Sequence, residues 1–184
     1  LKGKIKALFG ENLAIDTLLS IMGAERKIMK VTGSILHNKI HAGVSKEKSN
    51  LINIINEGLD KISIDELVEI ESHWVSNISL RQYSVPEIKR SISAQKIELT
   101  EKEKQWLKSH PKIKLGVDPH YPPFDFIGQN GRHQGVASDF VHLLSERLGI
   151  SIEMVTGLSW TQVIKRSKNK SIDVLALVKK NEER

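Results

Sequence analysis

A short loop rich in proline and aromatic residues is the part of this sequence best suited to contact a ligand. The loop follows an apolar run and reads GVDPHYPPFDF from Gly116 to Phe126. Its three prolines stiffen the backbone, and Tyr121 and Phe124 stand three residues apart. Stiff aromatic side chains suit a preorganised wall of a binding site. The same two rings could instead close the end of a hydrophobic core, and the segment by itself leaves both interpretations open.

The sequence contains no pattern of residues typical of a catalytic or metal-binding site. It has no cysteine, which excludes disulfides, thiolate metal sites and cysteine nucleophiles but fits an oxidising compartment as easily as a reducing one. His37 and His41 have a spacing that could hold a metal on a helix, but the strand-like run at their end argues against a helix. We therefore expect no metal, no cofactor and no enzymatic activity in this segment.

The charge balance does not favour nucleic acid as a partner. The net charge is +6, but 28 basic residues are spread among 22 acidic ones, and only 5% of residues are aromatic. No apolar run is long enough to cross a membrane. The sequence begins at Leu1, without an initiator Met, and we expect a fragment of a longer protein whose targeting segment or membrane anchor lies elsewhere.

Strand-like and helix-like runs alternate around the aromatic loop. Apolar strands followed by amphipathic helices predict a βαβαβ unit, which is an α/β open parallel sheet covered by helices on both faces. Ligands of such sheets bind at the carboxyl ends of the strands, so residues after Val117 and after Val178 should share one rim. The predicted strands are 113–117, 152–155 and 173–178, and the helices are 136–148 and 160–167.

The first part of the chain has a different order of elements, and residues 76–98 look like a connector. Capping boxes of a Ser or Thr followed three residues later by Glu or Gln mark where helices begin. They occur at Ser63, Thr100 and Ser159. The other predicted elements are strands at 5–9, 28–31 and 40–44, and helices at 13–22 and from Leu51.

The aromatic loop, together with the segments 134–139 and 171–174, resembles the first half of a family 3 bacterial extracellular solute-binding protein. Such proteins are two-lobed clamshells with the type II periplasmic-binding-protein fold. The resemblance implies that Tyr121 packs on the ligand, that Asp118 lies nearby, and that Arg184 grips a ligand carboxylate. Residues 178–181 replace the Ser and Thr hydroxyls that usually help to hold this carboxylate. Phe124 and Trp160 are further candidate contacts, although Trp160 could instead pack on the sheet.

The first part resembles the second half of the same family, with Glu11 at the position that faces the ligand amino group. The implied domains are residues 1–77, the end of one module; 78–98, a linker; and 99–184, lobe 1 of a second module. Two such modules in tandem resemble the periplasmic region of BvgS-type sensor histidine kinases. The resemblance implies a receptor that is anchored in the inner membrane and senses an amino acid or organic acid on the periplasmic side. It also implies that two copies of the receptor could form a homodimer.

Two other functions stay open at this stage. The module could be a ligand-free structural or signal-transmitting unit, which the lost hydroxyls favour. It could also be a dehydratase-type enzyme in which Glu11 and Asp118 act as acid and base. Because neither clamshell is complete, we also expect the helices between Leu51 and Val75 to pack on the second sheet, or chains to exchange elements.

Overall fold

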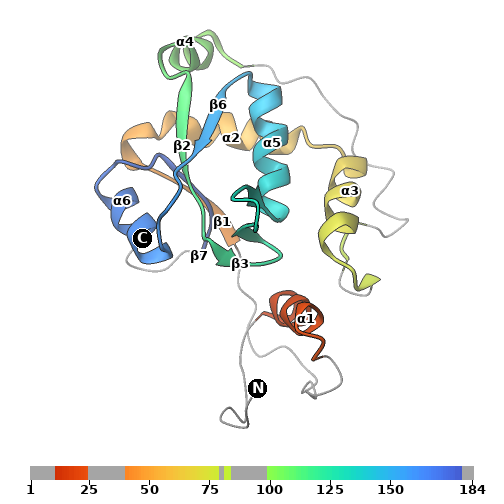
Figure 1. Ribbon diagram of the computed structural model, residues 1–184. Coiled ribbons are helices and arrows are strands. Elements are labelled where there is room, and N and C mark those ends of the chain that lie inside the picture. Colours follow the sequence, from red (N-terminus) through yellow and green to blue (C-terminus); the bar gives the residue numbers. More distant parts are fainter. Residues whose placement is uncertain (1–10, 25–39, 79–80, 84–98, 180–184) are drawn as a thin grey trace.

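A four-stranded open sheet forms the centre of the molecule (Figure 1). The computed structural model describes residues 11–24, 40–78, 81–83 and 99–179. The strand order is β1-β7-β2-β6, in which β2, β6 and β7 are parallel and β1 is antiparallel to β7. The strands are β1 Ile40–Val44, β2 Lys112–Gly116, β6 Ser151–Met154 and β7 Val174–Lys179. The predicted βαβαβ order is confirmed, because α5 (Val136–Leu148) and α6 (Trp160–Lys168) connect the three parallel strands.

Helices cover both faces of the sheet. On one face, Leu144 and Leu148 of α5 pack with Ile113 and Leu115 of β2 in a buried cluster. On the other face, Val163 of α6 forms a second cluster with two apolar residues of the β7 segment. The prediction of a sheet covered on both sides is therefore confirmed.

The four remaining helices and a small second sheet complete the described elements. Helix α4 precedes β2 in the chain. The small sheet follows β2 and lies in the loop that carries the aromatic residues. The helices are α1 Asn12–Ile21, α2 Asn50–Asp60, α3 Ile64–Trp74 and α4 Glu101–Ser109, with a 3₁₀ turn η2 at Lys46–Lys48; the small sheet contains β3 His120–Tyr121, β4 Asp125–Ile127 and β5 His133–Gln134. The strands predicted at 5–9 and 28–31 lie outside the described residues.

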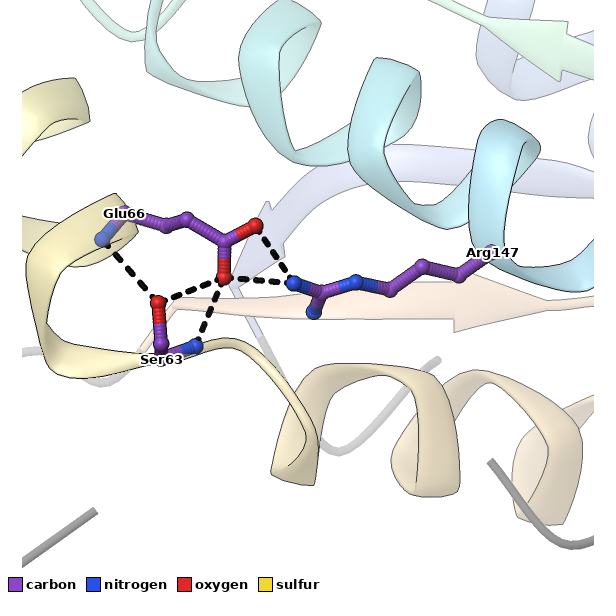
Figure 2. A network of polar contacts seen from close by, with 3 residues as sticks. All are labelled: Ser63, Glu66 and Arg147. Carbon is purple, nitrogen blue, oxygen red and sulfur yellow. Dashed lines mark hydrogen bonds and ion pairs between the residues drawn. The ribbon is translucent and has the colours of Figure 1, made fainter. Parts of the chain in front are cut away.

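The three predicted capping boxes are all formed, and one of them also joins two helices. Ser63 accepts from the backbone nitrogen of Glu66, and the Glu66 carboxylate accepts from the Ser63 nitrogen and hydroxyl. The same carboxylate receives Arg147 of α5, whose Nη2 lies 2.5 Å from each oxygen (Figure 2). The boxes of α4 and α6 have the same internal geometry.

Elements before the predicted linker pack on the sheet that follows it. Strand β1 pairs with β7 from Ile40↔Lys179 to Val44↔Val174, with an irregularity between His41 and Gly43. Leu51 and Ile54 of α2 are fully buried in the cluster that contains β2 and α5. The expectation that the helices between Leu51 and Val75 pack on the second sheet is therefore confirmed for α2, whereas Trp74 of α3 contacts α5. The domain boundary at 78–98 stays a prediction, since most of that segment lies outside the described residues.

Among the described helices, none combines the length and the apolar character that crossing a membrane requires.

Candidate ligand-binding rim

Strands β2 and β7 run in the same direction, and β7 extends past the end of β2 toward one rim of the sheet. These strands are parallel neighbours, with Gly116 opposite Leu175. The chain leaves β2 into the loop that carries Tyr121, and β7 ends at Lys179. The shared rim predicted from the strand order is therefore present, and the loop side chains and Lys179 can meet there.

A buried carboxylate holds the aromatic loop in place. Asp125 is completely buried. Its Oδ2 accepts from the backbone nitrogen of Asp118 at 2.9 Å, and its Oδ1 lies 2.6 Å from Nε2 of His133. Both oxygens of one buried carboxylate thus tie the start of the loop to the β5 strand, which makes the loop a rigid support for its aromatic rings. Sequence reasoning missed this residue, because its role depends on His133 across the small sheet.

Tyr121 and Phe124 form one partly buried aromatic pair. Their ring centroids lie 5.1 Å apart with the rings tilted. Burial raises the pKa of the Tyr121 hydroxyl, and its hydrogen bond to Glu11, the charge of Glu11 and that of Asp118 raise it further. The hydroxyl therefore stays protonated at neutral pH and acts as a hydrogen-bond donor at the rim.

Glu11, Tyr121 and Lys179 meet at this rim, and we call these three residues the rim cluster. The Tyr121 hydroxyl donates a short hydrogen bond to Oε2 of Glu11. The other oxygen, Oε1, lies 3.0 Å from Nζ of Lys179. Each oxygen of the Glu11 carboxylate therefore has its own donor, one neutral and one positively charged.

Asp118 lies at the start of the same loop and is partly buried. Its Oδ1 accepts from the His120 nitrogen at 2.9 Å. Burial raises the pKa of Asp118, and the charge of Asp125 adds to this effect, while the hydrogen bond from His120 opposes it. The His120 side chain is exposed.

The structure brings together only some of the residues predicted for the site. Tyr121 contacts both Phe124 and Glu11, whereas Arg184 lies outside the described residues. Trp160 packs against the apolar cluster beneath α6, as expected if it packs on the sheet. A contact between Trp160 and a ligand stays a prediction. Lys179 was noticed only as a departure from the family's hydroxyls; a long cation at the end of a rim strand is the signal that could have identified it.

A separate cavity of about 270 Å³ lies between the sheet and helices α2 and α5, and none of the three rim-cluster residues lines it. Its walls come from the sheet and from α2 and α5, including Leu59, Leu144 and Val174. Since this lining is almost entirely apolar, the cavity offers no donor set for a charged solute. The rim, with its tyrosine and lysine donors, has the chemistry that such a solute requires.

Residues 113–184 match the model of the bacterial extracellular solute-binding proteins, family 3. The sensor protein EvgS of Escherichia coli strain K12 is 28% identical over 111 residues, which is 60% of this chain and 8% of EvgS. The B. pertussis BvgS periplasmic domain is 22% identical, with a TM-score of 0.44 over 47% of this chain and 17% of that one. The arginine-bound domain 1 of TmArgBP, from T. maritima, is 29% identical, with a TM-score of 0.38 over 43% of this chain and 63% of that one.

Residues 113–184 thus match family 3 of the extracellular solute-binding proteins, part of the chain is similar to part of a sensor protein, and the open α/β sheet is of the periplasmic-binding-protein type. The predicted family and fold class are confirmed for this segment. The match spans 8% of the length of EvgS.

Proposed function

We propose that this chain is a ligand-sensing periplasmic segment of a transmembrane two-component sensor kinase, and that it binds a small amino acid or organic acid between two lobes. The observation that carries the proposal is the rim itself. A tyrosine donor, held by a clamped loop, stands at the carboxyl end of a solute-binding sheet. The relationship to a sensor protein supports a role in signalling.

In the proposed mechanism the chain binds the solute and does not transform it. Solute bound at the rim stabilises the closed arrangement of two lobes in proportion to its difference in affinity for the closed and open states. Tyr121 and Phe124 provide the aromatic wall, with Asp118 nearby, and Arg184 and Trp160 are proposed as further contacts. The parent protein is proposed to be anchored in the inner membrane and to dimerise.

Isothermal titration of the complete receptor ectodomain tests this function. The ligands are amino acids, organic acids and nicotinate-like compounds. We expect at least one of them to release heat, and we expect Tyr121→Ala to weaken its binding about tenfold or more, as loss of a buried aromatic contact does. His120→Ala, an exposed change in the same loop, is the matched control. If none of these compounds binds and signalling is unchanged in Tyr121→Ala, the sensing role is wrong.

A ligand-free structural role is the second candidate, and one observation favours it. The rim donors already hold a carboxylate of the chain itself, that of Glu11. A structure of the intact ectodomain distinguishes the two roles: a cleft filled by side chains supports the structural role, and an ordered solute or a polar, water-filled cleft supports sensing. The dehydratase-type alternative gains no support, since Glu11 is occupied by Tyr121 and Lys179; a product assay on the ectodomain tests it.

A further inference from the structure

The rim cluster has the geometry of a carboxylate site that already contains a carboxylate. One oxygen of Glu11 accepts from a phenol and the other faces an ammonium group 3.0 Å away. A neutral donor on one oxygen and a cation on the other satisfy the charge and the main hydrogen-bonding needs of a carboxylate. Any carboxylate placed at the same point would make the same two contacts.

The two donors lie on strands, Tyr121 in the small sheet and Lys179 in the four-stranded sheet, whereas the acceptor comes from a separate segment. Tyr121 lies on β3, which pairs with β4, and its ring packs on Phe124. Lys179 ends β7 and pairs with Ile40 of β1. The donors are therefore fixed by strand pairing on both sides.

Glu11 immediately precedes α1, which lies beyond the rim and apart from the helices that cover the sheet (Figure 1). The apolar side chains Leu18, Ile21 and Met22 of this helical segment are exposed, by 43%, 71% and 62%. Its buried residues Ala14 and Leu19 belong to neither of the two core clusters described above, so the helix is not locked into the core. Glu11 is therefore the member of the rim cluster that can leave.

We propose that Tyr121 and Lys179 form a carboxylate-binding pair, and that Glu11 is an internal carboxylate that a solute carboxylate must displace. This inference rests on the proposed solute-binding function and specifies the group of the solute that is recognised. It also gives the binding event a mechanical result, since displacing Glu11 releases the start of α1 from the rim.

The strength with which the Glu11 carboxylate competes with a solute carboxylate depends on its effective concentration at the rim. A carboxylate held on the same chain competes like a free ligand at a concentration of roughly millimolar order. Removing it should therefore raise the apparent affinity for a solute carboxylate, by about tenfold or more if the site is mostly occupied by Glu11. Lys179 is half-exposed, so the pair alone gives modest affinity, and the remainder of the solute must add to it.

The test measures binding of sodium acetate, succinate and L-glutamate to the full chain and to Glu11→Ala and Glu11→Gln. We expect Glu11→Ala to bind carboxylates about tenfold more tightly than the wild-type chain, and Glu11→Gln to be intermediate because the amide keeps an acceptor but loses the charge. Glu146→Ala removes an exposed glutamate on α5 and should bind as the wild type does. Circular dichroism and the urea midpoint establish that each variant is folded.

The two donors are then removed in the Glu11→Ala background, where no internal competitor remains. Tyr121→Phe keeps the ring and loses only the hydroxyl, and Lys179→Met keeps most of the stem and loses the charge. Each should lower carboxylate affinity several-fold. Methylammonium and phosphate at equal ionic strength test the class of ligand: either one binding as well as acetate overturns the carboxylate assignment.

The outcomes separate the inference from the proposed function. Equal carboxylate affinity in the wild type and Glu11→Ala overturns displacement but leaves solute binding intact. Carboxylates that bind neither chain overturn the inference, and the ectodomain titration then decides the proposed function. A fluorophore on Met22→Cys, unique because the chain has no other cysteine, should change its emission when glutamate binds the wild-type chain, and a constant signal despite binding contradicts the release of α1.

Discussion

Glu66 connects two helices through a single carboxylate. It is the N3 residue of the α3 capping box, and it accepts Arg147 of α5 on both oxygens. Only Nη2 of the guanidinium makes these contacts, while Nη1 is buried without a hydrogen-bond partner in the described part of the chain (Figure 2). Arginine is therefore used here as a single donor, and its second terminal nitrogen carries a desolvation cost.

Replacing Arg147 tests whether it acts as a single donor to Glu66 through Nη2. Arg147→Ala should lower the free energy of unfolding by about 1–2 kcal/mol, because Glu66 loses a partly buried charged partner. Arg147→Lys should cost less than about 0.5 kcal/mol, since one ammonium can replace Nη2 and the unsatisfied Nη1 is removed. Urea denaturation measures both, with the exposed Arg166→Ala as control. If the lysine variant is as unstable as the alanine variant, Nη1 contributes more than the geometry indicates.

The same carboxylate should contribute to the pH dependence of stability. Burial alone would raise the pKa of Glu66, but the hydrogen bonds from Ser63 and the contact with Arg147 outweigh it, so that the pKa lies below its ordinary value of 4.5. A lowered pKa means that the unfolded chain binds the proton more readily. The stabilising contribution is therefore complete above about pH 5 and is lost as the pH falls through the lowered pKa.

Urea titrations of the wild type and Glu66→Gln at several pH values measure this contribution. The wild type should be more stable by about 1–2 kcal/mol at pH 7, and the difference should shrink steadily below pH 4.5. Glu146→Gln, which changes an exposed glutamate on α5, should show no such convergence. A difference between wild type and Glu66→Gln that is the same at pH 3 and pH 7 would mean that the folded-state pKa is not lowered.

Local contacts of this kind are the ones that the sequence predicts well. Ser63 and Glu66 are three residues apart, and chain geometry alone brings them together once the helix forms. Tyr121 and Glu11 are 110 residues apart, and their contact depends on where the chain places α1. The predicted site named both residues as ligand contacts, but no local pattern indicated that they bind each other. Asp125 and His133 are close in the sequence, but they meet through the small sheet, which was not predicted.

At the scale of elements, β2 is crowded at its last residue. A Cβ at Gly116 would lie 2.7 Å from Cγ1 of Val163, 2.8 Å from Cδ2 of Leu175 and 3.1 Å from Cγ2 of Ile172. All three side chains belong to the cluster beneath α6. Glycine therefore allows α6 to approach the end of β2 just before the aromatic loop begins, which couples the packing of α6 to the position of the rim.

Gly116→Ala should accordingly destabilise the fold. Overpacking costs about 1–3 kcal/mol, of which the lower backbone entropy of alanine offsets a part. Combining it with Val163→Ala removes the nearest methyl group, so the double variant should lose at least about 0.5 kcal/mol less than the sum of the two single variants. Urea denaturation of the four chains in this cycle measures the coupling. Strict additivity would show that Val163 is not the neighbour that makes glycine necessary.

The observed bounds of the helices and strands agree closely with the predicted ones, but the partner of one strand was not predicted. The periodicity and the capping residues predicted α5 over the residues it occupies, and α6 and the three parallel strands to within one or two residues. Strand β1 was also predicted at its observed residues, but its antiparallel partner was not. Strand pairing between segments 130 residues apart depends on tertiary packing, because many apolar strands could fill the same edge.

At the scale of the whole molecule, the two parts of the chain share one hydrophobic core. Leu51 and Ile54 of α2 are 1% and 0% exposed, and they lie in the same cluster as Ile113 and Leu115 of β2. Trp74 at the end of α3 donates from Nε1 to Asp139 of α5 at 2.6 Å. Lys48 pairs with the buried Asp173 just before β7 at 2.9 Å. Residues 113–184 are therefore covered in part by residues that lie before the predicted linker.

Removing β1 and α2 should expose both the β7 edge of the sheet and the apolar residues that α2 buries. A fragment of residues 99–184 lacks β1, which leaves β7 unpaired on one side, and it lacks the apolar face of α2. Unpaired edges and apolar patches favour aggregation, so we expect this fragment to oligomerise, to bind a hydrophobic dye and to lose cooperative urea unfolding. A fragment of residues 40–184 keeps β1, α2 and α3 and should unfold cooperatively near the midpoint of the full chain. A monomeric 99–184 fragment with an unchanged midpoint would show that the solute-binding segment folds by itself and that the first part only rests on its surface.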